Sequence, residues 1–228
     1  MILDYRILSI GTLAIHELWE RQGEQRTAHA TTSLVRSGDR RIVVNPGLPA
    51  PVIAARLRER AGLCPEDISD VFLTSFLPDH RRGLAIFPNA RWLISENERD
   101  LVGSLLIEQF EQEQDEQARD LLREDIALLK RFQAAPDCLA PHVDLFPVPG
   151  FTPGACGLLL SESNRTVLVT GGAIGTSEHL EKGRVLRHSF DVEQAQISFT
   201  EVLEIADVIV PGYDNVILNN LRSHKIFG

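Results

Sequence analysis

A loop that follows a short apolar run carries the side chains of this chain that are best suited to chemistry. Asp79 and His80 are adjacent in this loop, and carboxylates and imidazoles are common ligands of zinc and other transition metals. A catalytic zinc needs about three protein ligands and an open position for water. The pair therefore predicts a metal site only if another segment supplies a third ligand.

Ser75 lies in the same loop and offers a second chemistry, in which it is a nucleophile, His80 its base and Asp79 the orienting group. Side chains that are adjacent in a chain diverge, so three such residues within six positions seldom reach the geometry that this chemistry requires. We therefore expect Ser75 to be a strand-end hydroxyl that bonds to the backbone.

Arg81 and Arg82 follow the Asp-His pair directly. A buried carboxylate needs a partner, and either guanidinium could neutralise Asp79. If both arginines reach the site, they form a cationic pocket that suits a carboxylate or phosphate ligand. The alternative is that both face solvent, as most arginines do.

The elements that position this loop are a buried strand before it and a turn after it. Val71, Phe72 and Leu73 form an apolar run that is typical of a strand covered on both faces of its sheet. Pro78 then breaks regular structure, and Gly83 permits a tight turn. Loops at strand ends are where α/β proteins place functional side chains.

Other apolar and β-branched segments predict strands in two groups, each closed by helices. The strands are expected within residues 5–19 and at 31–36, 41–44, 71–73, 91–94, 143–148, 155–160, 166–170, 184–187 and 208–210. Helices are expected at 51–63, within 95–133 and at 191–206. This order predicts an α/β fold, a four-layer αββα sandwich with two sheets between outer helices. Because no low-complexity linker divides the chain, residues 1–228 are expected to form a single domain.

Residues 95–133 form an extra helical stretch. Ser95 with Glu98 three positions later is a capping-box pattern, which predicts the start of a helix. A polar run at 109–117 separates two apolar stripes, so the stretch contains either two helices or one long helix with a solvated middle. Eleven acidic residues against five basic ones give it a net charge of −6. We interpret it as a solvated face, with a homodimer contact as the alternative.

Composition narrows the classes of protein to which the chain can belong. Its 228 residues are 43% hydrophobic, enough for a substantial core, and its net charge of −9 argues against nucleic-acid binding. Three cysteines without C-x-x-C spacing indicate unpaired thiols in a reducing compartment. The N-terminus has no signal-peptide pattern and no apolar run is long enough to span a membrane, so we expect a cytoplasmic protein without membrane contact.

The loop at residues 74–83 resembles the signature loop of the metallo-β-lactamase-fold superfamily, which reads T-H-x-H-x-D-H and continues to a glycine-rich step. Asp79 and His80 stand where the family has its Asp and His. Ser75 and Leu77 stand where the family has two further histidines. The frame of the motif is thus present while two of its four ligands are absent.

Later stretches resemble the same superfamily and have lost a ligand each. Phe151 replaces the His of P-G-H-T-P-G, and Gly172 replaces the metal-bridging Asp of V-L-x-x-G-D. Tyr213 replaces the last His of V-x-P-G-H, and Asn45 replaces the Asp that ends the early strand pair. The surrounding frame residues persist, so the resemblance covers nearly the whole chain and implies the family's fold.

The resemblance implies a pocket at the former ligand positions, which here hold Ser75, Leu77, Asp79, His80, Phe151, Gly172 and Tyr213. Only Asp79 and His80 keep the family's residue. A phenol such as Tyr213, with a reference pKa of about 10, is a poor zinc ligand. We therefore expect no metal and no cofactor, and the alternative is a single zinc, manganese or iron ion at Asp79 and His80.

Larger and more apolar side chains are expected to fill the vacated space. Phe151 and Tyr213 would pack where the family holds its metals, and Tyr213 could hydrogen-bond Asp79. His188 and His224 lie in late segments that could reach the same site. Each is expected to be a surface or core histidine rather than a ligand.

Two functions from different classes follow from these residues. The first is a pseudoenzyme: a non-hydrolytic protein that binds a small anionic ligand or a protein partner. The second is a hydrolase of an ester, thioester, lactone or phosphoester that uses one metal at Asp79 and His80. In the first case neither residue is catalytic, and in the second both are metal ligands.

Overall fold

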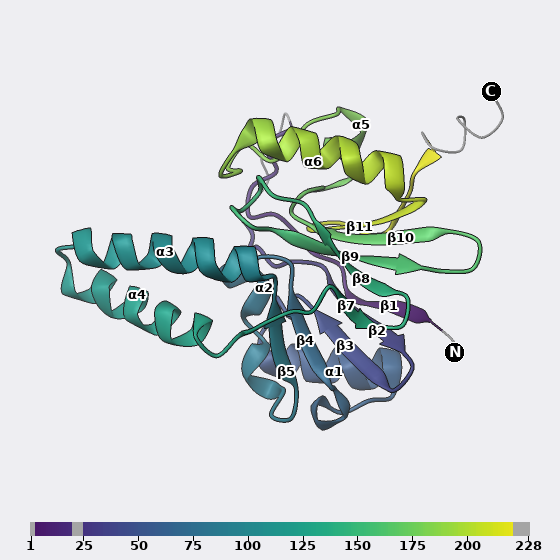
Figure 1. Ribbon diagram of the computed structural model, residues 1–228, viewed down its shortest axis with the longest axis horizontal. Helices are drawn as coiled ribbons and strands as arrows, with labels where there is room; N and C mark the ends of the chain where they lie inside the picture. The colour runs from purple at the N-terminus through teal and green to yellow at the C-terminus, as the bar shows by residue number, and fades with distance from the viewer. Residues whose placement is uncertain (1–2, 20–24, 221–228) are drawn as a thin grey trace.

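Two six-stranded sheets lie face to face between outer helices in the computed structural model, which describes residues 3–19 and 25–220 (Figure 1). The first sheet has the order β1-β2-β3-β4-β5-β6 and the second the order β12-β11-β10-β9-β8-β7. Helix α1 covers the outer face of the first sheet, and α5 and α6 cover the second. The predicted four-layer αββα sandwich is confirmed.

The first sheet is built from the N-terminal half of the chain. Its strands are β1 (Asp4–Ser9), β2 (Thr32–Ser37), β3 (Arg40–Val44), β4 (Asp70–Leu73), β5 (Arg91–Ile94) and β6 (Gln133–Ala134). Strands β3 to β6 run parallel to one another, while β1, β2 and β3 pair antiparallel. The parallel strands β3 and β4 therefore end at the same edge of the sheet, where the signature loop begins.

The second sheet is built from the C-terminal half. Its strands are β7 (Cys138–Ala140), β8 (Val143–Pro147), β9 (Cys156–Ser161), β10 (Thr166–Gly171), β11 (Val208–Pro211) and β12 (Ile217–Leu218). Strands β10 and β11 are parallel, so the loops that follow them, at 172–176 and 212–216, emerge together. The other neighbours are antiparallel.

Alternation along the strands produces three apolar cores. Phe72 of β4 packs between the two sheets with Val44 and Val169, while Val71 and Leu73 point to the opposite face, toward α1 (Ala50–Ala61). A third core joins the second sheet to α6 (Val192–Ile205). The apolar run at 71–73 is therefore a strand covered on both faces, as its sequence predicts.

The segment at 184–187 does not form the predicted strand. Its backbone is irregular, and Arg184 bonds to the carbonyl of His179 rather than to a strand of either sheet. Leu186 is instead buried against aromatic side chains of the candidate site. Within residues 5–19, only β1 is a strand, and beyond it a single bridge joins Thr12 to His29.

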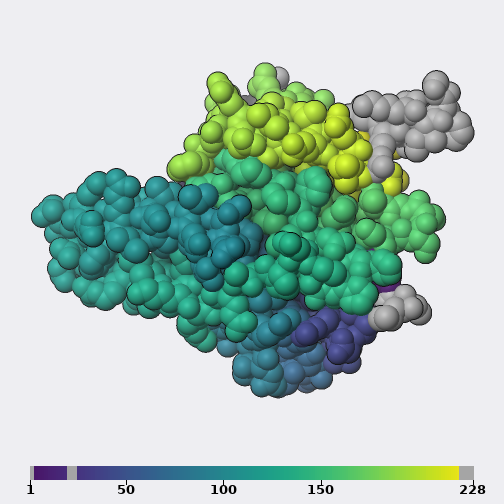
Figure 2. Space-filling view, viewed as in Figure 1, coloured from purple at the N-terminus to yellow at the C-terminus, as the bar shows by residue number. Residues whose placement is uncertain are grey.

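An arm of two antiparallel helices projects from the sandwich (Figures 1 and 2). These helices are α3 (Glu96–Gln112) and α4 (Glu116–Leu129), joined by a short turn, so the stretch at 95–133 contains two helices. Ser95 caps α3, because its hydroxyl accepts a hydrogen bond from the Glu98 amide. Leu101, Ile107 and Leu121 are exposed on the arm, and the homodimer contact stays a prediction.

Two expectations about the environment of the chain can be compared with the structure. All three cysteines are free thiols, as expected: Cys156 is buried, Cys64 half-buried and Cys138 exposed. None of the helices within the described residues combines the length and the apolar character that crossing a membrane requires.

Candidate functional site

The former ligand positions come together at the edge where β4, β10 and β11 end. Ser75 and His80 follow β4, with His80 in α2 (Pro78–Arg81), while Gly172 follows β10 and Tyr213 follows β11. The loop at 149–154 adds Phe151. The two sheets are also tied directly at this edge, because the amide of Cys156 donates to the carbonyl of Thr74.

A chain of hydrogen bonds links four side chains of the site. Ser75 Oγ lies 3.1 Å from His80 Nδ1, and His80 Nε2 lies 3.3 Å from the Tyr213 hydroxyl. That hydroxyl donates to Asp79 Oδ2 at 2.8 Å. The predicted bond between Tyr213 and Asp79 is therefore confirmed, and it joins the only two retained ligand residues through a tyrosine.

The protons of this chain have one consistent arrangement. The Tyr213 hydroxyl donates to the Asp79 carboxylate, so His80 Nε2 must carry a hydrogen and donate to the Tyr213 oxygen. His80 Nδ1 then accepts from the Ser75 hydroxyl. Burial lowers the pKa of His80, although the Asp79 charge acts in the opposite direction. Burial, with the Asp79 charge beside it, raises the pKa of Tyr213, so the phenol keeps its proton.

Aromatic and aliphatic side chains occupy the rest of the site. The Phe151 ring lies 6.3 Å from the His80 ring and 6.5 Å from the Tyr213 ring, between ring centroids. The apolar cluster consists of Phe151, Leu186 and Tyr213 with Leu13 and Leu77 beside them. A Cβ atom placed on Gly172 would lie 2.1 Å from Phe151 Cε1. The ring thus fills the space into which the family's bridging Asp would extend.

Asn45 supports the signature loop from β3. Its backbone has a φ of +50°, a conformation that Asn tolerates better than most residues. The side-chain amide donates to Thr74 Oγ1 and its oxygen accepts from the Thr74 backbone amide, both at 2.9 Å. Thr74 Oγ1 lies in turn 3.2 Å from His80 Nδ1. The substitution of Asp by Asn therefore provides a donor where a carboxylate has none.

The two arginines bind different partners, neither of which is Asp79. Arg81 binds Asp125 of α4 at 2.7 Å, and its guanidinium lies 4.3 Å from the centre of the Phe76 ring. Arg82 is exposed and donates to the carbonyl of Ala28. Within the described residues neither forms an ion pair with Asp79. Arg81 fastens the arm to the loop.

Glu98 is a positioning residue that sequence reasoning missed. It is fully buried, and its carboxylate accepts from the Phe76 amide, the Thr152 hydroxyl and the Gly154 amide, each at 2.9 Å. Burial raises the pKa of Glu98, although these three hydrogen bonds act in the opposite direction. The sequence pattern predicts that Glu98 caps helix α3. In the structure its carboxylate instead joins the signature loop to the loop that carries Phe151.

The Ser-His-Asp hypothesis fails on access and on geometry. Ser75 does reach His80, contrary to the expectation that side chains in this loop diverge. However, Ser75 and His80 are both 0% exposed, so no substrate can approach the hydroxyl. The Asp79 carboxylate accepts from Tyr213, and among the described hydrogen bonds it is linked to the His80 ring through that hydroxyl, so it does not orient His80 directly.

The residues of this site do not fit the family's two metals. Among residues 3–19 and 25–220, no cluster of three or more His, Cys, Asp or Glu side chains is arranged to hold a metal ion. Both nitrogens of His80 already have hydrogen-bond partners, and the Phe151 ring replaces a ligand with carbon. His188 lies against Phe151 with ring centroids 5.6 Å apart, and His224 lies outside the described residues.

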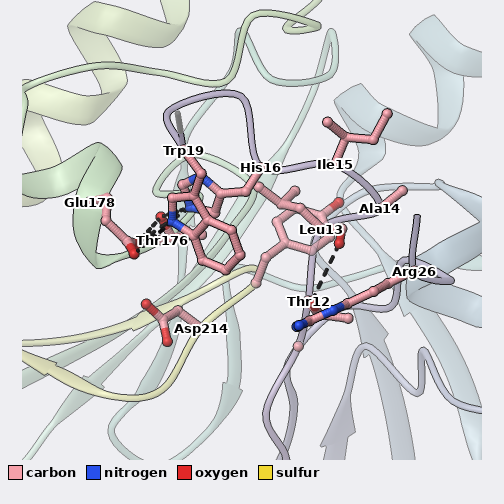
Figure 3. Close-up of a pocket in the computed structure, with 12 residues that line it drawn as sticks. Thr12, Leu13, Ala14, Ile15, His16, Trp19, Arg26, Thr176, Glu178 and Asp214 are labelled. Carbon is pink, nitrogen blue, oxygen red and sulfur yellow. Dashed lines mark hydrogen bonds and ion pairs between the residues drawn. The ribbon is translucent and has the colours of Figure 1, made fainter. Parts of the chain in front are cut away.

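A cavity adjoins this cluster and shares Tyr213 with it. It has a volume of about 220 Å³ and lies between the segment at 11–19 and the start of α5 (Ser177–Glu181) (Figure 3). Charged groups at its walls come from Arg26, Glu178 and Asp214. The sequence offered no signal for this cavity, because its walls come from segments more than 150 residues apart.

The pKa of His80 leads to a prediction about pH. Because the folded-state pKa lies below the ordinary value of 6.5, the stabilisation from neutral His80 is complete above pH 6.5 and is lost as pH falls below it. The unfolding free energy of the wild type should therefore exceed that of His80→Gln most at pH 7.5. This difference should shrink toward pH 5 by up to about 1.4 kcal/mol per pH unit.

Urea unfolding of both proteins between pH 5 and 7.5 measures this difference. A His80→Gln difference that stays constant over this pH range would contradict the buried neutral imidazole.

Comparisons with known proteins identify the class to which this fold and site belong. The family model of the metallo-beta-lactamase superfamily matches residues 27–212, most of the chain. The chain therefore belongs to the metallo-beta-lactamase superfamily. A search of curated proteins found no match.

Solved structures share the fold at low sequence identity. A Thermotoga maritima protein provisionally assigned as a metallo-beta-lactamase has a TM-score of 0.68 and 19% identity, over 95% of this chain and 99% of its own. The dizinc quorum-quenching lactonase AidC has a TM-score of 0.65 and 21% identity, over 82% and 72% of the two chains. AiiA of B. thuringiensis, with N-decanoyl-L-homoserine bound, has a TM-score of 0.60 and 19% identity, over 88% and 86%.

Proposed function

We propose that this protein is a metal-independent member of its superfamily that binds a small molecule instead of hydrolysing one. The observation that carries the proposal is the Phe151 ring, which lies where a Cβ on Gly172 would be 2.1 Å from its Cε1. No carboxylate fits beside that ring to bridge two metals. The position at which the family generates its nucleophile is filled with carbon.

The hydrogen-bond chain supports the same proposal. A histidine that binds zinc uses one nitrogen for the metal and commonly donates from the other to a second partner. Both nitrogens of His80 instead form hydrogen bonds with side chains, one with Ser75 and the other with Tyr213. Asp79 accepts from Tyr213, so the two retained ligands bind each other through the phenol. This arrangement satisfies the buried polar groups without a metal.

A hydrolase with one metal at Asp79 and His80 is the competing function. The dizinc lactonase AidC has this fold, as does AiiA, and a lactone is one substrate class for such an enzyme. For this chain the hydrolase would require Tyr213 to leave both residues and a third ligand to approach. In the family a bound metal activates the water that hydrolyses the substrate, and without a metal this site has no other group to activate it.

Metal content after purification without chelator tests the proposal. We expect less than about 0.1 equivalent of zinc, manganese or iron, and no rise in melting temperature when each metal is added, because a bound metal would stabilise the fold. Close to one equivalent of metal that disappears in both Asp79→Ala and His80→Ala would establish the hydrolase site instead. Asp39→Ala, in the exposed turn between β2 and β3 at the end of β3 opposite the site, is the control.

A further inference from the structure

The cavity beside Tyr213 has walls from two distant parts of the chain (Figure 3). Thr12, Leu13, Ala14 and Ile15 supply one wall and the start of α5 supplies the other. His16 fastens the first wall to the second, since its Nε2 lies 3.0 Å from Thr176 Oγ1. At about 220 Å³, the cavity is below the roughly 300–1,000 Å³ of sites for drug-sized ligands, so it suits a small metabolite.

Two carboxylates and one guanidinium face this cavity. Figure 3 shows Glu178 and Asp214 on one side of the view and Arg26 on the other. Although burial opposes ionisation, hydrogen bonds from its own amide, Thr176 and Trp19 lower the pKa of Glu178 to about 2, which keeps it charged. Both oxygens of each carboxylate already accept hydrogen bonds. Glu178 Oε1 accepts only from Trp19 and Asp214 Oδ1 only from the Asn215 amide, so each of these oxygens keeps a lone pair for a ligand.

Arg26 supplies the positive charge. Its side chain is exposed and lines the cavity, and it has no hydrogen bond or ion pair with another side chain within the described residues. A guanidinium with free donors binds a carboxylate in a bidentate manner. Among the described residues, the cavity thus presents an unpaired cation at one side and hydrogen-bonded anions at the other.

The remaining lining is apolar. Leu13 and Ile15 lie on the first wall, and the Trp19 indole is 46% exposed while one of its faces stacks on His16 at 4.5 Å. The Trp19 position is fixed further, because its Nε1 donates to Glu178 Oε1 at 3.1 Å. An aliphatic group of a ligand can therefore be buried between these side chains.

We propose that this cavity binds a free α-amino acid with an aliphatic side chain. In this arrangement Arg26 binds the ligand carboxylate, Glu178 and Asp214 bind its ammonium, and Leu13, Ile15 and Trp19 enclose its side chain. The inference rests on the proposed function, since it names the ligand class of the same binding protein.

Ligands with a single charge fit less well. A simple carboxylate would bind Arg26 but would lie near two carboxylates, and a simple amine would satisfy the carboxylates but would lie near Arg26. Only a zwitterion pairs each charge of the cavity with its opposite. Binding of both charged ends of the ligand is therefore the discriminating observation.

Tryptophan fluorescence can report binding directly. The chain has two tryptophans, and replacing the buried Trp92 by phenylalanine leaves Trp19 at the cavity as the only one. L-Leucine titrated into Trp92→Phe should change its emission saturably. 4-Methylpentanoate, which lacks the amine, and isoamylamine, which lacks the carboxylate, should each bind at least about tenfold more weakly. Calorimetry on the wild type checks that Trp92→Phe has not altered the cavity.

Charge variants assign the two ends of the ligand. Arg26→Gln should weaken leucine binding at least about tenfold while leaving isoamylamine binding unchanged or tighter, and Asp214→Asn should weaken leucine and isoamylamine. Arg56, which pairs with the exposed Glu59 on α1, supplies the control variant Arg56→Gln.

Three results would overturn the inference. They are no saturable response to leucine at about 10 mM, an analogue that binds as tightly as leucine, and an Arg26→Gln variant with unchanged affinity. Metal content is measured on the same samples. Failure of leucine to bind a metal-free protein would reject the ligand class alone, whereas stoichiometric metal would reject the proposed function alone.

Discussion

Glu98→Ala should lower the free energy of unfolding by about 3–5 kcal/mol, measured by urea denaturation at pH 7. The change leaves the amides of Phe76 and Gly154 and the hydroxyl of Thr152 without the acceptor that they share. Each buried donor without a partner costs about 1–3 kcal/mol, and the sum is reduced where a water can enter. The loops on either side of Glu98 should also lose protection from hydrogen exchange.

A graded series tests whether this loss comes from the acceptors. Glu98→Gln keeps one acceptor oxygen and places an NH₂ group against a donor, so its loss should lie between those of alanine and wild type. Glu96 is in the same turn of α3 with a side chain that is 71% exposed, and Glu96→Gln should change stability by less than about 0.5 kcal/mol. Equal losses for Glu98→Gln and Glu96→Gln would show that the three bonds have no net value.

Gly172→Ala should destabilise the wild type by about 2–3 kcal/mol but should have little effect in a Phe151→Ala background. The added Cβ would lie 2.1 Å from Phe151 Cε1, and the ring is only 3% exposed, so it has no free space into which to move. Removing the ring removes the overlap. A double-mutant cycle should therefore give a coupling energy of about 2 kcal/mol between the two positions.

Gly103 in α3 supplies the matched control for this cycle. A Cβ there would meet Leu129 Cδ2 at 3.6 Å, an ordinary contact. Gly103→Ala should therefore stabilise the protein by up to about 1 kcal/mol through helix propensity. An additive cycle at positions 151 and 172 would show that the ring yields to the new atom, and the space in front of Gly172 would then be open to a carboxylate.

The sequence was sufficient for the fold because the frame around each lost ligand was retained. The apolar run at 71–73, the strand expected at 166–170 just before Gly172 and the helix expected at 191–206 are local signals, and each occurs where predicted. The bond between Tyr213 and Asp79 followed from placing both residues at former ligand positions. The prediction of the fold and of this bond thus depends on local sequence patterns and on positions within the family's motifs.

The features that could not be predicted from the sequence depend on contacts between segments that are far apart in the chain. Glu98 shows a helix-cap pattern, and only the folded chain places its carboxylate against Thr152, 54 positions away. Arg81 points to Asp125 on the arm because the arm folds back to α2. The segment at 184–187 has the composition of a strand, but it is irregular in the structure and Leu186 packs against Phe151 and Tyr213 instead.

The arm of α3 and α4 divides into two parts that are free to change to different degrees. Its base holds Glu98, which binds both loops of the site, and Asp125, which binds Arg81 beside His80. Its far end, around the turn at 113–115, extends beyond the sandwich. Changes of sequence or length at the far end should leave the site unaltered. Changes at the base should affect it, because Glu98 and Asp125 are only one or two contacts from His80. Related proteins should therefore differ in the length of the arm while keeping the contacts between its base and the loops of the site.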